Sequence, residues 1–390
     1  MKILRLTMKG LPNFREELCI DFVAKQRVDE KDMEQLHHAF SNIYTNPVLS
    51  FIGINASGKT TILKVVSFAI ELLGNQPLNN ICFKEILDDL SVQQTVLFTS
   101  FFYHDDTIYK LETLIKKKVT ALDKNKRFII EDETLWEKKF QNVKTKKGIF
   151  DFSASHLLIK RDGSEKFLPN DVSIMIALNK QLDTKFFLYD MSNLTDYNIL
   201  NALGNYPREI LTFFDPSIEF LNCREDEKEV DIQLKFRGKE EIRLKHPEEL
   251  NRYLSSGTIK GLGVFIRAFF AFWEGGYLIV DELENHFNKE IVATLIRFFL
   301  DKRVNRNGGT LIFSTHYSEL LDHFDRNDTI YIVKNKQGIG IANLAELLKR
   351  NDVKKSEVYD SDFLEGTVPE YESYIALKKV LMTSKVREEL

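Results

Sequence analysis

The feature that most constrains the fold is the segment Gly53-Ile54-Asn55-Ala56-Ser57-Gly58-Lys59-Thr60, which joins an apolar run to a helix-like run. The apolar run covers Val48 to Ile52, and the helix-like run covers Thr61 to Leu73. A strand, a glycine-containing loop and a helix in this order are typical of a phosphate-binding loop. Backbone N–H groups turn inward around the anion, and the helix N-terminus adds a favourable field. The segment therefore predicts binding of a nucleoside triphosphate.

Two residues of this P-loop suit specific parts of the chemistry. Lys59 is expected to reach the β- and γ-phosphates of ATP, and the Thr60 hydroxyl is expected to ligate Mg²⁺. The other residues expected to bind the nucleotide are Gly53, Asn55, Ala56, Ser57, Gly58 and Thr61.

A second apolar run, Tyr277 to Val280, ends in the carboxylates Asp281 and Glu282. Such a run is expected for a buried strand of a parallel sheet, whose C-terminal end faces the ligand. Asp281 suits the Mg²⁺ shell, and Glu282 suits the base that orients or deprotonates the attacking water. An apolar strand that ends in Asp-Glu is common by itself, so the neighbouring motifs matter.

Two short motifs flank the carboxylate strand. Leu254-Ser255-Ser256-Gly257-Thr258 precedes a helical segment from Ile259 to Trp273, and the strand Thr310 to Ser314 leads to Thr315-His316. Each motif is weak alone, since Ser256 could simply cap a helix and the histidine could be an exposed residue. Their order on the expected elements is far more specific.

In this order the motifs resemble the ABC-type ATPase superfamily, with its P-loop, Leu-Ser-Gly-Gly-Gln-like signature, Asp-Glu pair and switch histidine. The segment Asp281 to His286, the compact signature and Phe14-Arg15 further resemble the stand-alone AAA-type ATPases related to the RecF, SMC and OLD proteins. Many of those come from anti-phage systems. Tyr359 to Pro369 also resembles the end of that ATPase module. The resemblance covers about residues 1–75 and 215–370 and is poor between them.

The resemblance implies an α/β fold, an ABC-type P-loop NTPase with a mixed sheet core, an antiparallel β subdomain and an inserted helical lobe. It implies ATP hydrolysis with Mg²⁺ by a head-to-tail homodimer or a multiple of it. In such a dimer, Ser255 or Ser256 and the Gly257 amide would cap the γ-phosphate held by Lys59 of the other subunit. His316 would sense that phosphate, with Glu282 and Lys59 as the other catalytic residues, and Asn285 would lie at the interface.

Three departures limit this carry-over. The third position of the signature is Ser256 rather than Gly, and the fifth is Thr258 rather than Gln. Gln93 and Gln94 are candidates for the Q-loop, although they open a strand-like stretch. No aromatic residue that would stack on the nucleobase can be named.

The expected organisation is an ATPase core of residues 1–75 and 215–345, an inserted β/helical lobe of residues 76–214, and a tail of residues 346–390 packed on the core. A polar, mobile stretch is expected from Ala24 to Asn46. Turn signals predict one hairpin around 104–106 and a second around 237–239.

The spacing of the motifs excludes several relatives. About 190 residues separate Thr60 from the signature, too few for the long arms of SMC proteins, and no Cys-x-x-Cys hook is present. Fewer than 80 residues follow His316, too few for the nuclease domain of OLD proteins. An effector such as a nuclease is therefore expected to act in trans.

Composition indicates a cytoplasmic enzyme without a membrane span. The net charge is −4, and the three cysteines are too far apart for a zinc spacing or a disulfide framework. The charge balance reverses between Lys110 and Lys147, which holds twelve basic and six acidic residues. Its clustered lysines are Lys116, Lys117, Lys118, Lys144, Lys146 and Lys147. This stretch could contact nucleic-acid phosphates, or it could be the solvated face of a small β-rich subdomain.

The resemblance points to a defence-associated or DNA-maintenance ATPase that acts as a sensor or scaffold for a partner effector. A RecF-like DNA clamp or repair factor and a scaffold that binds ATP without hydrolysing it remain the alternatives. A transporter ATPase fits least well, because of the insertion and the altered signature.

Overall fold

The computed structural model describes residues 1–118, 127–143, 145–161, 168–192, 204–226, 229–285, 287–368 and 371–382. Its centre is a six-stranded sheet in the order β10-β15-β16-β5-β17-β18. These strands are β10 (Leu188–Asp190), β15 (Tyr277–Val280), β16 (Thr310–Thr315), β5 (Val48–Ile52), β17 (Ile330–Asn335) and β18 (Ile339–Asn343). Every neighbouring pair is parallel except β17 and β18. The predicted α/β class with a mixed core sheet is confirmed.

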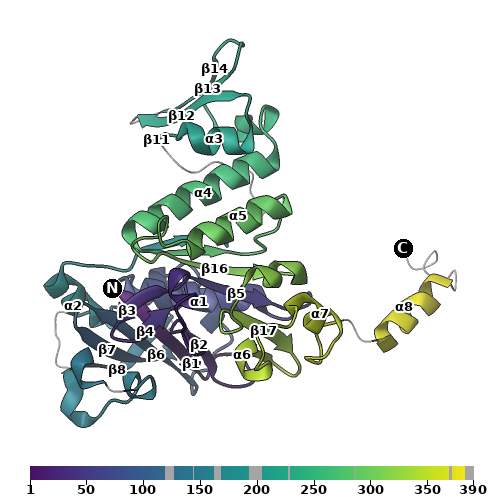
Figure 1. The fold of residues 1–390 in the computed structure, drawn as a ribbon. Helices are drawn as coiled ribbons and strands as arrows, with labels where there is room; N and C mark the ends of the chain where they lie inside the picture. Colours follow the sequence, from purple (N-terminus) through teal and green to yellow (C-terminus); the bar gives the residue numbers. More distant parts are fainter. Residues whose placement is uncertain are drawn as a thin grey trace.

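Both faces of the central sheet are covered (Figure 1). Helices α4 (Ser256–Glu274) and α5 (Lys289–Leu300) pack on one face with Leu311 and Phe313 of β16. Helix α1 (Lys59–Leu73) and a second sheet pack on the other face with Ile312. Side chains alternate between the faces of a strand, so a strand covered on both sides is apolar throughout. This explains why these strands are readable as apolar runs.

The second sheet is antiparallel and has the order β2-β1-β6-β7-β8-β9. Its strands are β2 (Leu18–Asp21), β1 (Lys2–Lys9), β6 (Thr95–His104), β7 (Thr107–Lys117), β8 (Phe128–Lys139) and β9 (Leu157–Lys160). The hairpin predicted around 104–106 joins β6 to β7, with Asp105 at φ 50°. Helix α2 (Met175–Leu182) buries Met175 and Leu178 in the same core.

The expected insertion, residues 76–214, contributes strands to three sheets. It supplies β6 to β9 of the second sheet, β10 of the central sheet and β11 (Gly204–Asn205) of a third. Because β6 pairs directly with β1 of the N-terminal segment, this part of the insertion continues an existing sheet.

The third sheet and helix α3 (Arg208–Phe214) form a projection that we call the arm (Figure 1). Besides β11, its strands are β12 (Ile218–Asp226), β13 (Glu229–Phe236) and β14 (Ile242–Leu244). The hairpin predicted around 237–239 joins β13 to β14. The first half of α4 packs in the arm through Ile259 and Leu262, and its second half packs on the central sheet through Ala268. Helix α4 therefore connects the two regions.

Two segments differ from expectation. The stretch 24–46 contains a hairpin of β3 (His37–Phe40) and β4 (Ile43–Thr45). Phe40 and Ile43 anchor this hairpin, because they are buried in a small core that also includes Leu4 and Phe101. In the tail, α6 (Leu344–Leu347) and α7 (Lys355–Asp360) lie against the core. Helix α8 (Tyr371–Met382) has no buried side chain and projects from the body (Figure 1), so the expected packing of the whole tail is wrong for α8. No described helix is both long and apolar enough to cross a membrane.

Candidate nucleotide-binding site

The P-loop leaves the carboxyl end of β5 and enters α1 directly. Ala56 and Gly58 have positive φ angles, 59° and 100°, and these turn the backbone around the loop. A Cβ atom at Gly58 would lie 2.7 Å from the Ile339 side chain, so glycine is required there. Gly58 is the N-cap residue of α1, and the first turn of α1 carries no acidic side chain. The free N–H groups at this helix start fit an anion.

The Lys59 ammonium group lies over the loop and is almost fully buried, with 5% of the residue exposed. Its Nζ donates to the carbonyl oxygens of Gly53 at 2.9 Å and Ile54 at 3.2 Å, and lies 3.2 Å from His316 Nδ1. Burial lowers the pKa of Lys59, and the nearby carboxylates, Asp281 first, partly offset this. A desolvated cation in this position is suited to phosphate oxygens.

Thr60 and Asp281, the predicted magnesium ligands, lie side by side. The Thr60 hydroxyl donates to Asp281 Oδ2 at 2.6 Å, and the other carboxylate oxygen accepts a hydrogen bond from the Ser314 hydroxyl. Mg²⁺ is bound through one or two protein oxygens together with phosphate oxygens and water. This pair of hard oxygen ligands beside the P-loop therefore fits Mg²⁺ with a nucleotide.

Glu282 and His316 also lie in contact. Glu282 Oε1 lies 3.2 Å from His316 Nε2, and Glu282 Oε2 accepts a hydrogen bond from Asn285 Nδ2. Glu282 has φ 45°, a conformation that costs a non-glycine residue free energy. Its N–H donates to Ser314 Oγ at 2.8 Å, which holds this backbone conformation. The strained backbone turns the Glu282 carboxylate toward His316.

Three residues that sequence reasoning missed support this arrangement. Glu284 Oε1 accepts the backbone N–H of His316 at 2.6 Å, and Ser314 bonds to both strand-end carboxylate residues. Lys260, one turn into α4, donates to the carbonyl oxygens of Asn285 at 3.1 Å and Glu282 at 3.4 Å. Ser314 and Glu284 adjoin recognised motifs and could have been considered, but no sequence signal identifies Lys260.

The neighbouring strand β10 places another carboxylate at this edge. Asp190 is in register with Ile279 of β15, and its Oδ1 accepts the backbone N–H of Ser192 at 2.7 Å. Burial raises the pKa of Asp190.

Gln93 and Gln94, the Q-loop candidates, precede β6 and are exposed. Strand β6 belongs to the second sheet, as the strand-like stretch indicated, and the Q-loop role of these two residues stays a prediction.

The signature residues lie at the start of α4. Ser255 is the N-cap residue, and its hydroxyl accepts the backbone N–H of Thr258 at 3.0 Å. Ser256 and Gly257 begin the helix. In the part of the chain that the structure describes, no hydrogen bond joins these three residues to the P-loop, Asp281 or Glu282. The structure thus brings together the P-loop, the carboxylates and His316, but not the signature.

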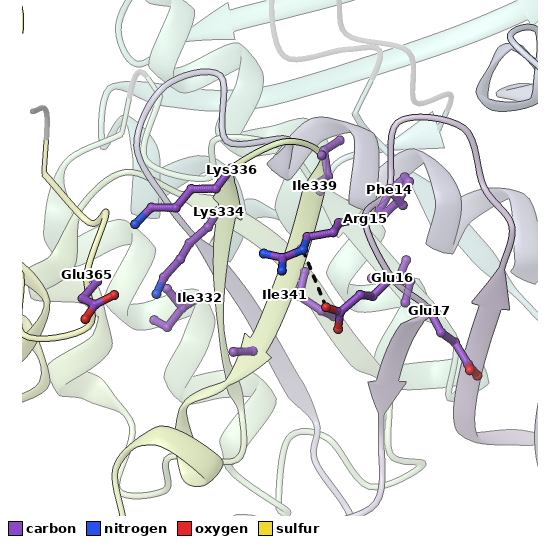
Figure 2. Close-up of a pocket in the computed structure, with 14 residues that line it drawn as sticks. Phe14, Arg15, Glu16, Glu17, Ile332, Lys334, Lys336, Ile339, Ile341 and Glu365 are labelled. Atoms are coloured by element: carbon purple, nitrogen blue, oxygen red, sulfur yellow. Dashed lines mark ion pairs between the residues drawn. The ribbon is translucent and has the colours of Figure 1, made fainter.

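A cavity of about 300 Å³ (Figure 2) is linked to the P-loop through Ile339, which lines the cavity and lies against Gly58. The loop between β1 and β2, with Phe14 and Arg15, forms one side, and Lys334 and Lys336 of the β17–β18 hairpin lie across from it. Ile339 forms a backbone bridge with Phe14 and faces Gly58 of the P-loop. Phe14 is thus an aromatic side chain beside the nucleotide loop, a position that sequence reasoning left unassigned.

The other residues predicted to bind the nucleotide, Asn55, Ser57 and Thr61, belong to the P-loop and the first turn of α1. The lysines predicted to contact nucleic acid belong to the basic stretch of residues 110–147. Lys116 forms an ion pair with Glu131, and Lys117 donates to the Asp88 carbonyl at 2.8 Å. Lys144 and His286 lie outside the described residues.

A family model described as "AAA domain, putative AbiEii toxin, Type IV TA system" matches residues 48–322. That range begins at β5 and includes the P-loop, the signature, both carboxylates and His316. The chain belongs to this AAA family. No curated protein matches it. Membership supports the predicted P-loop ATPase character and nucleotide binding.

Proposed function

We propose that the chain binds ATP with Mg²⁺ and hydrolyses it at the carboxyl edge of the central sheet. The observation that carries the proposal is the series of contacts from Lys59 through His316 to Glu282, each at 3.2 Å. It lies beside the Thr60–Asp281 pair. Strands β5, β16 and β15 are neighbours and parallel, so their ends present these groups together.

In the proposed reaction, Lys59 and the start of α1 hold the β- and γ-phosphates, and Thr60 and Asp281 hold Mg²⁺. The bound metal ion neutralises charge on the phosphate oxygens. Glu282 orients a water molecule and accepts its proton as the water oxygen bonds to the γ-phosphorus. The bond to the leaving β-phosphate oxygen breaks, giving ADP and inorganic phosphate. His316 contacts Glu282 and Lys59, so it is placed to respond to the γ-phosphate.

The cavity beside the P-loop is proposed to receive the nucleoside. Phe14, Ile339 and Ile341 offer apolar surface to a base, and Arg15 and Lys334 are cationic groups on the same cavity. The cavity shares Ile339 with the wall of the P-loop. A nucleotide whose phosphates lie in the loop would therefore extend directly into it.

We further propose that two copies close head-to-tail, with the signature of one copy on the nucleotide of the other. This is supported by the resemblance to ABC-type ATPases and by the position of Ser255, Ser256 and Gly257, which form no hydrogen bond with the P-loop within the described part of their own chain. Lys260 joins the same helix to the backbone of Glu282. A contact made at the signature could thus change the position of the Glu282 backbone through Lys260.

The biological role proposed is that of a sensor or scaffold ATPase in defence, working with a separate effector protein. The family description, which names a toxin of a type IV system, supports a role of this kind. A RecF-like clamp would instead need DNA to change ATP turnover.

The direct test is phosphate release by the purified chain with and without Mg²⁺. Turnover that requires Mg²⁺ and is lost in Lys59→Ala is the expected result. ATP binding without turnover would replace the proposal by the non-hydrolysing scaffold, and stimulation of turnover by DNA would favour the clamp.

A further inference from the structure

A second cavity, of about 530 Å³, lies at the far end of β2 from the P-loop. Leu18 at the start of β2 lines the cavity beside the P-loop, and Asp21 at its end lines this one. At about 3.3 Å per residue, the two strand ends are roughly 10 Å apart. The volume is within the range of small-molecule sites. This cavity is therefore separate from the proposed ATP site.

The cavity is lined by cationic and by apolar side chains. The cationic lining residues are Arg5, Lys25, Lys146 and Lys147, against the single carboxylate Asp21. The apolar lining consists of Val23, Ala24 and Phe150. Two of the lysines come from the basic stretch of residues 110–147, and the fold brings them to Arg5, about 140 residues earlier in the chain. The lining carries a formal charge of +3.

Arg5 is held in a fixed orientation. Its guanidinium carbon lies 3.6 Å from the centre of the Phe150 ring, and its Nε is bonded to Asp21. Among the described residues, its two terminal amino groups have no hydrogen-bond or ion-pair partner, and 27% of the side chain is exposed. A guanidinium that is already ordered presents a planar pair of donors, which matches two oxygens of a phosphate.

The lysines add donors around the same space. Lys146 Nζ donates to the carbonyl oxygens of Ala24 at 2.7 Å and Gln26 at 3.0 Å, which uses two of its three N–H bonds. Burial lowers the pKa of Lys146, and a bound anion would offset that loss of hydration. Lys147 is exposed, with no ion pair to a described residue. Lys25 is already paired with Asp21 and Glu346.

We propose that this cavity binds a phosphate ester, with the phosphate between Arg5, Lys146 and Lys147 and an organic group on the Phe150 side. A nucleotide and the backbone of a nucleic-acid strand share this chemistry. The proposal does not depend on hydrolysis at the P-loop.

The test uses the full chain carrying Lys59→Ala, so that the P-loop does not contribute. A labelled 12-nucleotide single strand is titrated at several salt concentrations, and unlabelled strand, AMP and inorganic phosphate are used as competitors. Competition by AMP identifies a free nucleotide as sufficient. Competition only by the strand identifies a backbone site.

Two variants and a matched control decide the outcome. Lys147→Glu and Arg5→Gln are each expected to weaken binding at least about tenfold. Lys147→Glu should also make the slope of log affinity against log salt concentration shallower, by about the amount that one or more phosphate contacts contribute. Lys160→Glu makes the same charge change on exposed β9, outside the cavity, and should change binding less than about twofold. A melting temperature checks that each variant is folded.

Three results would overturn the proposal. The first is absence of binding to the strand and to AMP at millimolar concentration. The second is an equal loss in Lys147→Glu and Lys160→Glu, which would indicate only diffuse charge. The third is unchanged binding by a folded Arg5→Gln protein; if that variant is unfolded, Lys147→Glu against Lys160→Glu decides alone.

Discussion

The carboxyl edge of the central sheet and the start of α4 differ in how complete they are within one chain. At the sheet edge, His316 touches both Lys59 and Glu282 beside the Thr60–Asp281 pair. At the start of α4, the signature serines are engaged with their own helix, where Ser255 caps it through Thr258. The difference is that one chain assembles the P-loop, the carboxylates and His316, whereas its signature makes no hydrogen bond to them among the described residues. It is this difference that motivates the proposal that a second copy completes the site.

Removing the cation of the sheet-edge half should have the largest effect. Lys59→Ala removes the buried ammonium that the P-loop aims at the phosphates, so ATP affinity should fall at least about 100-fold and turnover should vanish. Calorimetric titration with ATP measures this. Lys64→Ala is the matched control, because Lys64 lies on the same helix and contacts Glu85 and the Phe83 ring rather than the P-loop. Near-normal ATP affinity of the Lys59→Ala variant would contradict the assignment of residues 53–60 as the nucleotide-binding P-loop.

Glu282→Gln separates binding from chemistry in the same half. The amide keeps the size of the side chain but cannot accept the proton from water, so turnover should fall about 10²- to 10⁴-fold while ATP still binds. The ATP-bound closed dimer should then accumulate in light scattering. Glu319→Gln, on an exposed glutamate paired with Lys289, should retain turnover. Wild-type turnover in Glu282→Gln would show that another group is the base.

Lys260→Met tests the link between the two halves. The substitution removes the donor to the backbone of Asn285 and Glu282 and leaves an unbranched side chain that is shorter by one atom. We expect turnover to fall about tenfold, by loss of charge-assisted hydrogen bonds that position the backbone, with ATP affinity changed less than about threefold. Phosphate release and calorimetry measure the two quantities. An equal loss in both would mean that Lys260 acts on the fold as a whole.

Phe14→Ala should have the smallest effect. If the base lies in the cavity beside the P-loop, loss of the ring should weaken ATP binding by about 1 kcal/mol, or roughly fivefold. The affinity for inorganic triphosphate should not change, since it lacks a base. A similar loss of affinity for ATP and for inorganic triphosphate would indicate that Phe14 stabilises the P-loop and does not contact the base.

Much of the sheet edge is predictable from the sequence because each group adjoins a local pattern. Buried parallel strands are apolar runs, and the residues that follow them meet at one edge. Lys260 is different, because its role depends on how α4 packs against β15. The strand after Gln94 was predicted, but its pairing with β1 was not, because that pairing joins segments distant in sequence. The β3–β4 hairpin was missed for a similar reason, since Phe40 packs against side chains distant in sequence.

The central claim, that the two halves of a site come from two copies, is tested most directly by mixing two inactive variants. The Lys59→Ala variant keeps an intact signature, and the Ser256→Arg variant keeps an intact P-loop. One of the two sites in a mixed dimer would therefore combine two intact halves. Random exchange should restore about a quarter of wild-type turnover, since half of the dimers are mixed and each has one working site. A mixture of Lys59→Ala with the double variant should remain inactive. No recovery in the first mixture, or full turnover by Ser256→Arg alone, would contradict the composite site.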